Sequence, residues 1–174
     1  VTPTGPDKGF SAAVRAEPMR AKAIELDSAP ALGISWFLPV LARNPGVKVR
    51  HLDPKIVEAN RPLFERAKYF GDDGVAVAAA YTAGALERAG FEVKYTPLFT
   101  SLMRVLAEND LSVLRMRKPP SQTEAEQRFL NLVKSRYGSR YKEFGLSSSQ
   151  ELLEVAQRLY RATRLSAIGS LVLG

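Results

Sequence analysis

The chain has 174 residues, of which 45% are hydrophobic and 25% are charged, and its net charge is +7. These proportions are typical of a folded protein, and the length suffices for one domain with extensions. It has no cysteine, which excludes disulfides, thiolate nucleophiles and cysteine-ligated zinc, and its one histidine, His51, leaves little scope for a catalytic triad. No apolar run approaches the ~20 residues that span a bilayer. We therefore expect a protein that is not an enzyme and has no cofactor, metal, small-molecule substrate or membrane span.

The positive charge is concentrated in the last third of the chain. Residues 1–114 carry 14 Lys/Arg against 13 Asp/Glu, whereas residues 115–174 carry 11 against 5. A nearly neutral region followed by a basic one favours contact with a polyanion, of which RNA is the leading candidate. The plainer alternative is that these side chains only solvate exposed helices.

The first half of the chain predicts short strands alternating with helices. Residues 1–20 are expected to form an N-terminal arm, in which basic and small residues are typical of an organelle-import remnant or a ribosomal arm. A strand is expected at 21–27, and apolar spacing predicts a helix from 32 to 41. The helix should end at Asn44-Pro45-Gly46, because proline and glycine stop helices. Alternating residues then predict a second strand at 47–52.

The middle of the chain completes the expected domain, which spans residues 21–118. The expected elements are a strand at 62–70, a turn at 71–74, an alanine-rich helix at 75–89, a strand at 91–96, an amphipathic helix at 98–109 and a short extended piece at 111–116. The order is β-α-β-β-(α)-β-α. This α/β layout predicts a thioredoxin-like fold, in which 75–90 is an inserted helix.

Beyond Pro119-Pro120 the sequence predicts a basic, mostly helical extension, residues 119–174. Two serines each precede a glutamate by three residues, the spacing of a helix-capping box, at 121–124 and 148–151. Each box leads into an apolar-periodic stretch. We therefore expect helices at about 122–137 and 149–164.

Three short segments and one glycine resemble one known family. Residues 42–47 (ARNPGV), 61–71 (RPLFERAKYFG) and 111–119 (LSVLRMRKP), together with Gly33, resemble segments of the family of mitochondrial large-subunit ribosomal protein forty-three, in the same order. The family's thioredoxin-like domain also occurs in a small-subunit mitochondrial ribosomal protein and in an accessory subunit of respiratory complex I. The helix at 75–90 and the C-terminal helices depart from the family pattern.

The resemblance implies a structural constituent of the mitochondrial large ribosomal subunit in the mitochondrial matrix. Its implied partners are ribosomal RNA and neighbouring mitochondrial ribosomal proteins. The first alternative is the complex I accessory subunit, for which a strongly basic tail would be superfluous. The second is a degenerate thioredoxin-fold enzyme, which would need a polar pocket with a perturbed titratable group.

The first candidate RNA contact is the cluster Arg115, Arg117 and Lys118. Lys and Arg hold folded RNA mainly through its phosphates, and side chains two apart on an extended chain share a face. The alternative is that these cations face acidic protein neighbours or water.

The second candidate interleaves cations with aromatic rings and consists of Arg136, Tyr137, Arg140, Tyr141 and Lys142. Tyrosines can stack on unpaired bases while cations bind phosphates. The alternative is a helix end whose tyrosines face the core and whose cations form a solvated rim.

Lys48 and Arg50 form a third candidate basic face. Basic residues on a sheet edge are also a common device against aggregation, and this interpretation is preferred here. The Asp72-Asp73 pair between glycines predicts a plain turn, because the ligand spacing of a calcium loop is missing.

Overall fold

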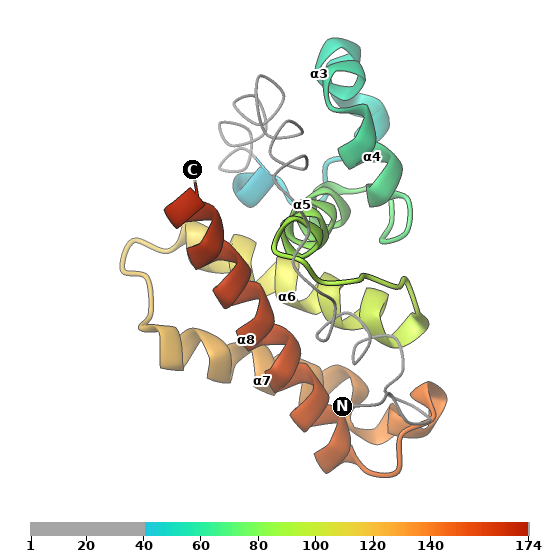
Figure 1. Ribbon diagram of the computed structural model, residues 1–174, viewed down its shortest axis with the longest axis vertical. Helices are drawn as coiled ribbons and strands as arrows, with labels where there is room; N and C mark the ends of the chain where they lie inside the picture. The colour runs from blue at the N-terminus through green and yellow to red at the C-terminus, as the bar shows by residue number, and fades with distance from the viewer. Residues whose placement is uncertain (1–40, 174) are drawn as a thin grey trace.

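The computed structural model describes residues 41–173, with the side chains of residues 41–164, and this part of the chain is built from helices (Figure 1). Residues 41–43 are also helical. The elements are η3 (Val49–His51), α3 (Pro54–Ala59), α4 (Arg61–Ala67), α5 (Gly74–Arg88), α6 (Pro97–Arg115), α7 (Gln122–Tyr137), η4 (Gly138–Phe144) and α8 (Ser149–Leu173). No strand occurs among these residues, and their only β-type pairing is an isolated bridge between Lys48 and Asp73.

The predicted α/β thioredoxin-like fold is therefore wrong. The strand expected at 47–52 is a short 3₁₀ helix, and the strand expected at 62–70 is mostly α4. Residues 91–96 are irregular, and residues 111–115 continue α6. The strand at 21–27 and most of the helix at 32–41 lie outside the described residues. The helix at 75–89 is confirmed as α5, but it occupies the centre of a helical fold.

The error at α4 shows why a short apolar run is ambiguous. Phe64 and Ala67 are buried on one face, three residues apart, which suits one helical turn. Pro62 lies in the first turn, where its missing N–H leaves no helical hydrogen bond unmade. The helix is further favoured by Glu65, Arg66 and Ala67, which are good helix formers.

The expected strand at 91–96 has no neighbouring strand, and the expected extended piece at 111–116 is not separated from the helix before it. Residues 91–96 do alternate, because Phe91, Val93 and Tyr95 are half-buried while Glu92 and Lys94 are exposed, but no described strand lies beside them. Residues 111–115 follow the predicted helix 98–109 with no helix-ending residue between them. Adding turns to an existing helix is easy, so α6 continues to Arg115.

Helix α5 forms the hub of the fold. It contacts α4, α6 and α8 (Figure 1). Every residue from 74 to 80 is buried. Most of these residues are alanine or glycine, whose small side chains let neighbouring helices approach closely. The chain folds here by close packing of small residues around one central helix.

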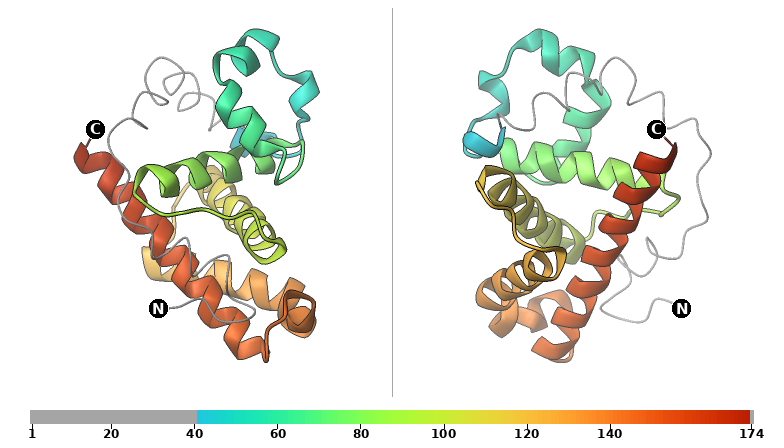
Figure 2. Two further views of the ribbon diagram at one scale, coloured as in Figure 1. Left: turned by 45° about the vertical axis from the view of Figure 1, so that its right-hand side comes forward. Right: turned by 90° about the vertical axis from the view of Figure 1, so that its left-hand side faces the viewer.

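The two C-terminal helices begin where the capping boxes predict. Ser121 Oγ accepts a hydrogen bond from the Glu124 amide at 3.2 Å, and Ser148 Oγ accepts one from the Glu151 amide at 3.1 Å. Helix α8 runs across the molecule along α7 and reaches α5 (Figure 2). Phe129 of α7 is fully buried against this helix, with its ring 5.5 Å from that of Tyr160. The helices of the expected extension thus share a core with α5 and α6.

No described helix combines the length and the apolar character that a membrane crossing requires.

Candidate nucleic-acid interface

The corner between α6 and α7 carries the first predicted RNA-contact cluster. Arg115 is the last residue of α6, and Arg117 and Lys118 follow in the connecting loop; all three are exposed. Arg128 of α7 extends back to this corner, where its Nη2 donates to the Ser112 Oγ at 3.2 Å. The structure therefore brings four cations to one place, of which Arg128 was not predicted. We call Arg115, Arg117, Lys118 and Arg128 the basic corner.

The charges of the basic corner are available to a ligand. In the part of the chain that the structure describes, no ion pair joins any of the four cations to a carboxylate. Leu114, immediately before the cluster, is 58% exposed. The packing of α6 against α7 fixes the two ends of the loop. An anion meeting this corner finds no carboxylate that it must first displace.

The second predicted cluster, residues 136–142, is arranged differently. Arg136 donates through both terminal nitrogens to the carboxylate of Glu108 on α6, with the Nη1–Oε2 distance at 2.7 Å. Arg140 donates to Glu143 at 2.7 and 2.9 Å. The hydrogen bonds from Arg136 hold the pKa of Glu108 below its usual value, against the effect of burial. The two arginines are thus already neutralised within the protein.

The tyrosines of this cluster pack inward. Tyr137 and Tyr141 are half-buried against the core, and the Tyr137 ring meets Phe144 edge-on at 5.4 Å. The Arg140 guanidinium lies 5.3 Å from the centre of the Tyr137 ring. All three cations are exposed, and Lys142 differs from the two arginines in that it makes no ion pair among the described residues. Tyr137 and Tyr141 therefore do not form the exposed base-stacking surface that the sequence predicted as one alternative.

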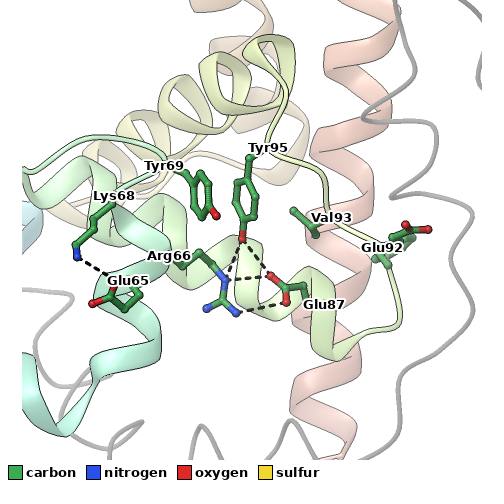
Figure 3. Close-up of a pocket in the computed structure, with 9 residues that line it drawn as sticks. Glu65, Arg66, Lys68, Tyr69, Glu87, Glu92, Val93 and Tyr95 are labelled. Atoms are coloured by element: carbon green, nitrogen blue, oxygen red, sulfur yellow. Dashed lines mark hydrogen bonds and ion pairs between the residues drawn. The ribbon is translucent and has the colours of Figure 1, made fainter.

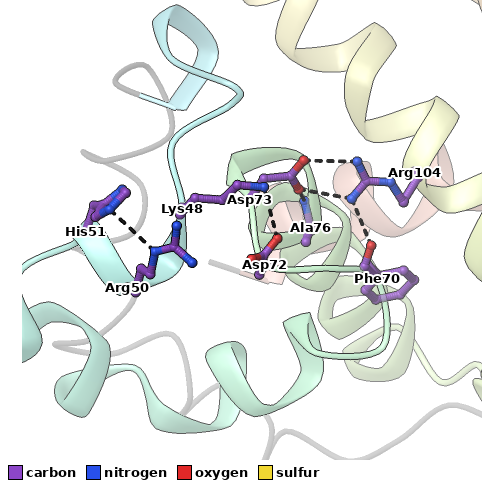
Figure 4. A network of polar contacts seen from close by, with 8 residues as sticks. All are labelled: Lys48, Arg50, His51, Phe70, Asp72, Asp73, Ala76 and Arg104. Carbon is purple, nitrogen blue, oxygen red and sulfur yellow. Dashed lines mark hydrogen bonds and ion pairs between the residues drawn. The ribbon is translucent and has the colours of Figure 1, made fainter.

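The third predicted face, Lys48 and Arg50, lies where η3 meets the start of α5 (Figure 4). The Lys48 Nζ pairs with Asp72 Oδ1 at 3.3 Å, and the Val49 amide donates to the Asp72 carbonyl at 2.7 Å. Arg50 is exposed, and its Nε lies 3.5 Å from His51 Nε2. Lys48 thus fastens η3 to the turn before α5.

The turn before α5 contains an arginine clamp that the sequence reasoning missed. Arg104 of α6 donates to both carboxylate oxygens of Asp73 at 3.0 Å and to the Phe70 carbonyl at 2.8 Å (Figure 4). Asp73 also caps α5 by accepting from the Ala76 amide. Gly71 has a φ of +140°, and a Cβ there would lie 2.9 Å from the Arg104 Nη1. Only glycine suits both conditions.

The two aspartates of this turn thus have structural partners. Burial would raise the pKa of Asp73, but the hydrogen bonds from Arg104 and from the Ala76 amide outweigh it and lower that pKa below its usual value. Within the described residues, no three His, Asp or Glu side chains are grouped so that they could hold a metal ion.

A hollow of about 710 Å³ lies between α4, the end of α5 and residues 91–96 (Figure 3). At its floor, Arg66 Nε donates to Glu87 Oε1 at 3.0 Å and to the Tyr95 hydroxyl at 3.1 Å, and that hydroxyl lies 3.2 Å from the same carboxylate oxygen. Tyr69 stacks on Tyr95 beside it. The sequence predicted no site here, because the contact between Arg66 and Glu87 joins residues 21 apart in the chain.

Comparison with known protein families, with curated proteins and with solved structures gives no match for this chain.

Proposed function

We propose that this protein is a non-catalytic RNA-binding component of a ribonucleoprotein particle. The observation that carries the proposal is the basic corner, where Arg115, Arg117, Lys118 and Arg128 converge and no described carboxylate neutralises them. Phosphate oxygens are the ligands that such a group of guanidinium and ammonium cations suits best. The contacts would hold RNA by charge and shape, without reading its sequence.

The particle that the sequence resemblance suggests is the mitochondrial large ribosomal subunit, and we retain it as the first particle to test. This part of the proposal, with its location in the mitochondrial matrix and its ribosomal protein neighbours, is supported by the three short segments and Gly33, which occur in family order. The shared thioredoxin-like fold no longer supports it, because residues 61–67 and 111–115 are helical. The degenerate thioredoxin-fold enzyme is dropped with that fold.

RNA binding is tested by fluorescence anisotropy with a labelled single-stranded 20-nucleotide RNA and the full chain. The variant replaces Arg115, Arg117 and Lys118 with alanine. If each cation contacts a phosphate, affinity should fall about tenfold or more at 0.15 M salt, and the dependence of log K on log salt should flatten by about 2, at ~0.7 per contact.

A control variant that loses three charges elsewhere shows whether the loss of RNA affinity comes from the position of the cations or from the lower net charge. Lys55 on α3, Lys94 after α5 and Lys134 in the last turn of α7 are exposed and make no ion pair among the described residues, so their alanine variant loses the same charge. Its affinity should stay within about threefold of the parent, because distant exposed charges are screened. Equal losses in both variants, or no loss in the corner variant, would reject the basic corner as the RNA contact.

The particle is tested by sedimenting a tagged chain from a mitochondrial lysate. Co-migration with large-subunit ribosomal RNA that ribonuclease abolishes would support the ribosomal proposal. Migration with complex I that ribonuclease leaves unchanged would favour the alternative partner. RNA binding in vitro combined with a slow, free peak would keep the RNA proposal and reject both particles.

A further inference from the structure

Tyr69 is a rigid aromatic ring exposed at the surface of the hollow. Its side chain is among the most exposed large hydrophobic groups in the described chain, at 59%. The ring lies parallel to that of Tyr95, with centroids 4.0 Å apart and planes 7° apart. Tyr95 is in turn held edge-on by Phe70 and Phe99, at 5.6 and 6.0 Å. Since Tyr95 covers one face of Tyr69, the other face is presented to solvent in a fixed orientation.

The floor of the hollow is a preorganised polar network (Figure 3). The Tyr95 hydroxyl donates to Glu87 at 3.2 Å. Burial, followed by the charge of Glu87, raises the pKa of Tyr95 to about 12. From the described residues, the second oxygen of Glu87 accepts one long bond, of 3.4 Å, from Arg66. A carboxylate oxygen has two lone pairs, so Glu87 retains capacity to accept from a ligand.

The lining of the hollow carries an excess of negative charge. Arg66 is neutralised by Glu87, and Lys68 is neutralised by Glu65 at 3.0 Å. Glu92 is exposed and makes no ion pair with a described residue. The charges of the lining residues by themselves therefore favour a cation over an anion. The volume of about 710 Å³ is ample for one long side chain.

These features together suit a guanidinium group. A guanidinium is planar, stacks on the face of a tyrosine and donates to carboxylates through a fork of N–H groups. An ammonium has no planar surface to stack. A nucleobase could stack on Tyr69, but it would bring its phosphates towards the carboxylates that line the hollow. We propose that this hollow binds an arginine side chain of a basic segment in a partner protein.

This proposal does not depend on RNA binding at the basic corner. The two surfaces have opposite preferences, because one gathers free cations and the other combines tyrosines with excess carboxylate. A chain with both can bind a polyanion and a basic protein segment at the same time.

The test is an NMR titration of the full chain, isotope-labelled in its aromatic rings, with N-acetyl-arginine-N-methylamide at constant ionic strength. The ring signals of Tyr69 and Tyr95 should shift in a saturable way, with a Kd of about 1–30 mM, as suits one small fragment. The lysine analogue should bind at least about threefold more weakly, because it cannot stack. The uncharged citrulline analogue should cause no saturable shift.

Variants identify the contact. Tyr69→Leu should weaken arginine binding at least about fivefold, whereas Tyr69→Phe should stay within about twofold, because the ring face is kept. Glu92→Gln should weaken it about twofold or more, because the excess charge is removed. Arg117→Ala, in the basic corner, should leave it unchanged. Circular dichroism of Tyr69→Leu should match the parent, since this side chain is mostly exposed.

Three results would overturn the proposal. One is the absence of a saturable shift with the arginine analogue up to 100 mM, about three times the weakest expected Kd. The second is a shift of the Tyr69 ring by adenosine monophosphate and not by the arginine analogue, which would make the hollow a nucleobase site. The third is a loss of RNA affinity in Tyr69→Leu as large as that in the basic-corner variant. A failure of RNA binding in every variant would reject only the proposed function.

Discussion

The C-terminal third contains two basic segments, residues 115–118 and 136–142. They have the same number of cations but differ in whether carboxylates bind them. Both contain three cations within a few residues. In the first, the cations project from a helix end and a loop without carboxylate partners in the described chain. In the second, Arg136 and Arg140 are bound by Glu108 and Glu143. A dense run of positive charge therefore does not by itself identify a surface that can bind an anion.

The difference arises from where the carboxylates lie. Glu108 is 28 residues from Arg136 in the sequence, and the packing of α6 against α7 brings them together. An exposed ion pair contributes only about 0.2–1 kcal/mol, so RNA could displace such a carboxylate at modest cost. The comparison thus predicts a graded difference between the two segments: strong contact at the basic corner and weak contact at residues 136–142.

The largest change in stability is expected for Arg104, whose guanidinium is bound by Asp73 and by the Phe70 carbonyl. Arg104→Ala removes the hydrogen bonds to Asp73 and to the Phe70 carbonyl, and it leaves a partly buried carboxylate unpaired. The free energy of unfolding should fall by about 2 kcal/mol, between the values for exposed and buried ion pairs. Urea denaturation monitored by circular dichroism measures this change.

The free cation Arg117 supplies the matched control for this experiment. Arg117→Ala should change the free energy of unfolding by less than about 0.5 kcal/mol, because an exposed side chain without a partner stabilises little. Similar losses of stability in the two variants would show that the ion pair of Arg104 does not distinguish it from Arg117.

Acidification should weaken the ion pairs of Asp73 with Arg104 and of Glu108 with Arg136. The pKa values of Asp73 and Glu108 are lowered in the folded protein from ordinary values of 3.8 and 4.5. Their contribution to stability is therefore complete above about pH 4.5 and is lost as the pH falls through the lower folded values. Urea denaturation of the parent and of Asp73→Asn between pH 7 and pH 3 should show a smaller acid-induced loss in the variant. An equal loss would mean that Asp73 does not contribute.

The smallest effect is expected for the surface pair of Arg136 and Glu108. A double-mutant cycle with Arg136→Ala and Glu108→Ala should give a coupling energy of about 0.5–1 kcal/mol. RNA affinity of Arg136→Ala should fall less than about threefold, because its charge is already neutralised in the protein. A loss as large as that of the basic-corner variant would remove the distinction between the two segments.

The predictions that held are those that depend on local chemistry. The caps Ser121 and Ser148 mark the starts of α7 and α8, because a serine oxygen can satisfy a free amide wherever the helix lies in the fold. Alanine-rich α5 and amphipathic α6 were also found at the expected positions. The strands failed because alternation or a short apolar run becomes a strand only beside a partner, and residues 91–96 have none in the described chain.

The sequence by itself therefore determined four main helices, two helix starts and the concentration of positive charge after residue 114. Only the tertiary structure decided which cations are free. It paired Arg104 with Asp73 and Arg136 with Glu108, brought Arg128 to the basic corner, and stacked Tyr69 on Tyr95. The physical reason is that helix formation and capping involve residues within about one turn, whereas ion pairs and ring stacks depend on side chains that helix packing brings together from distant parts of the chain.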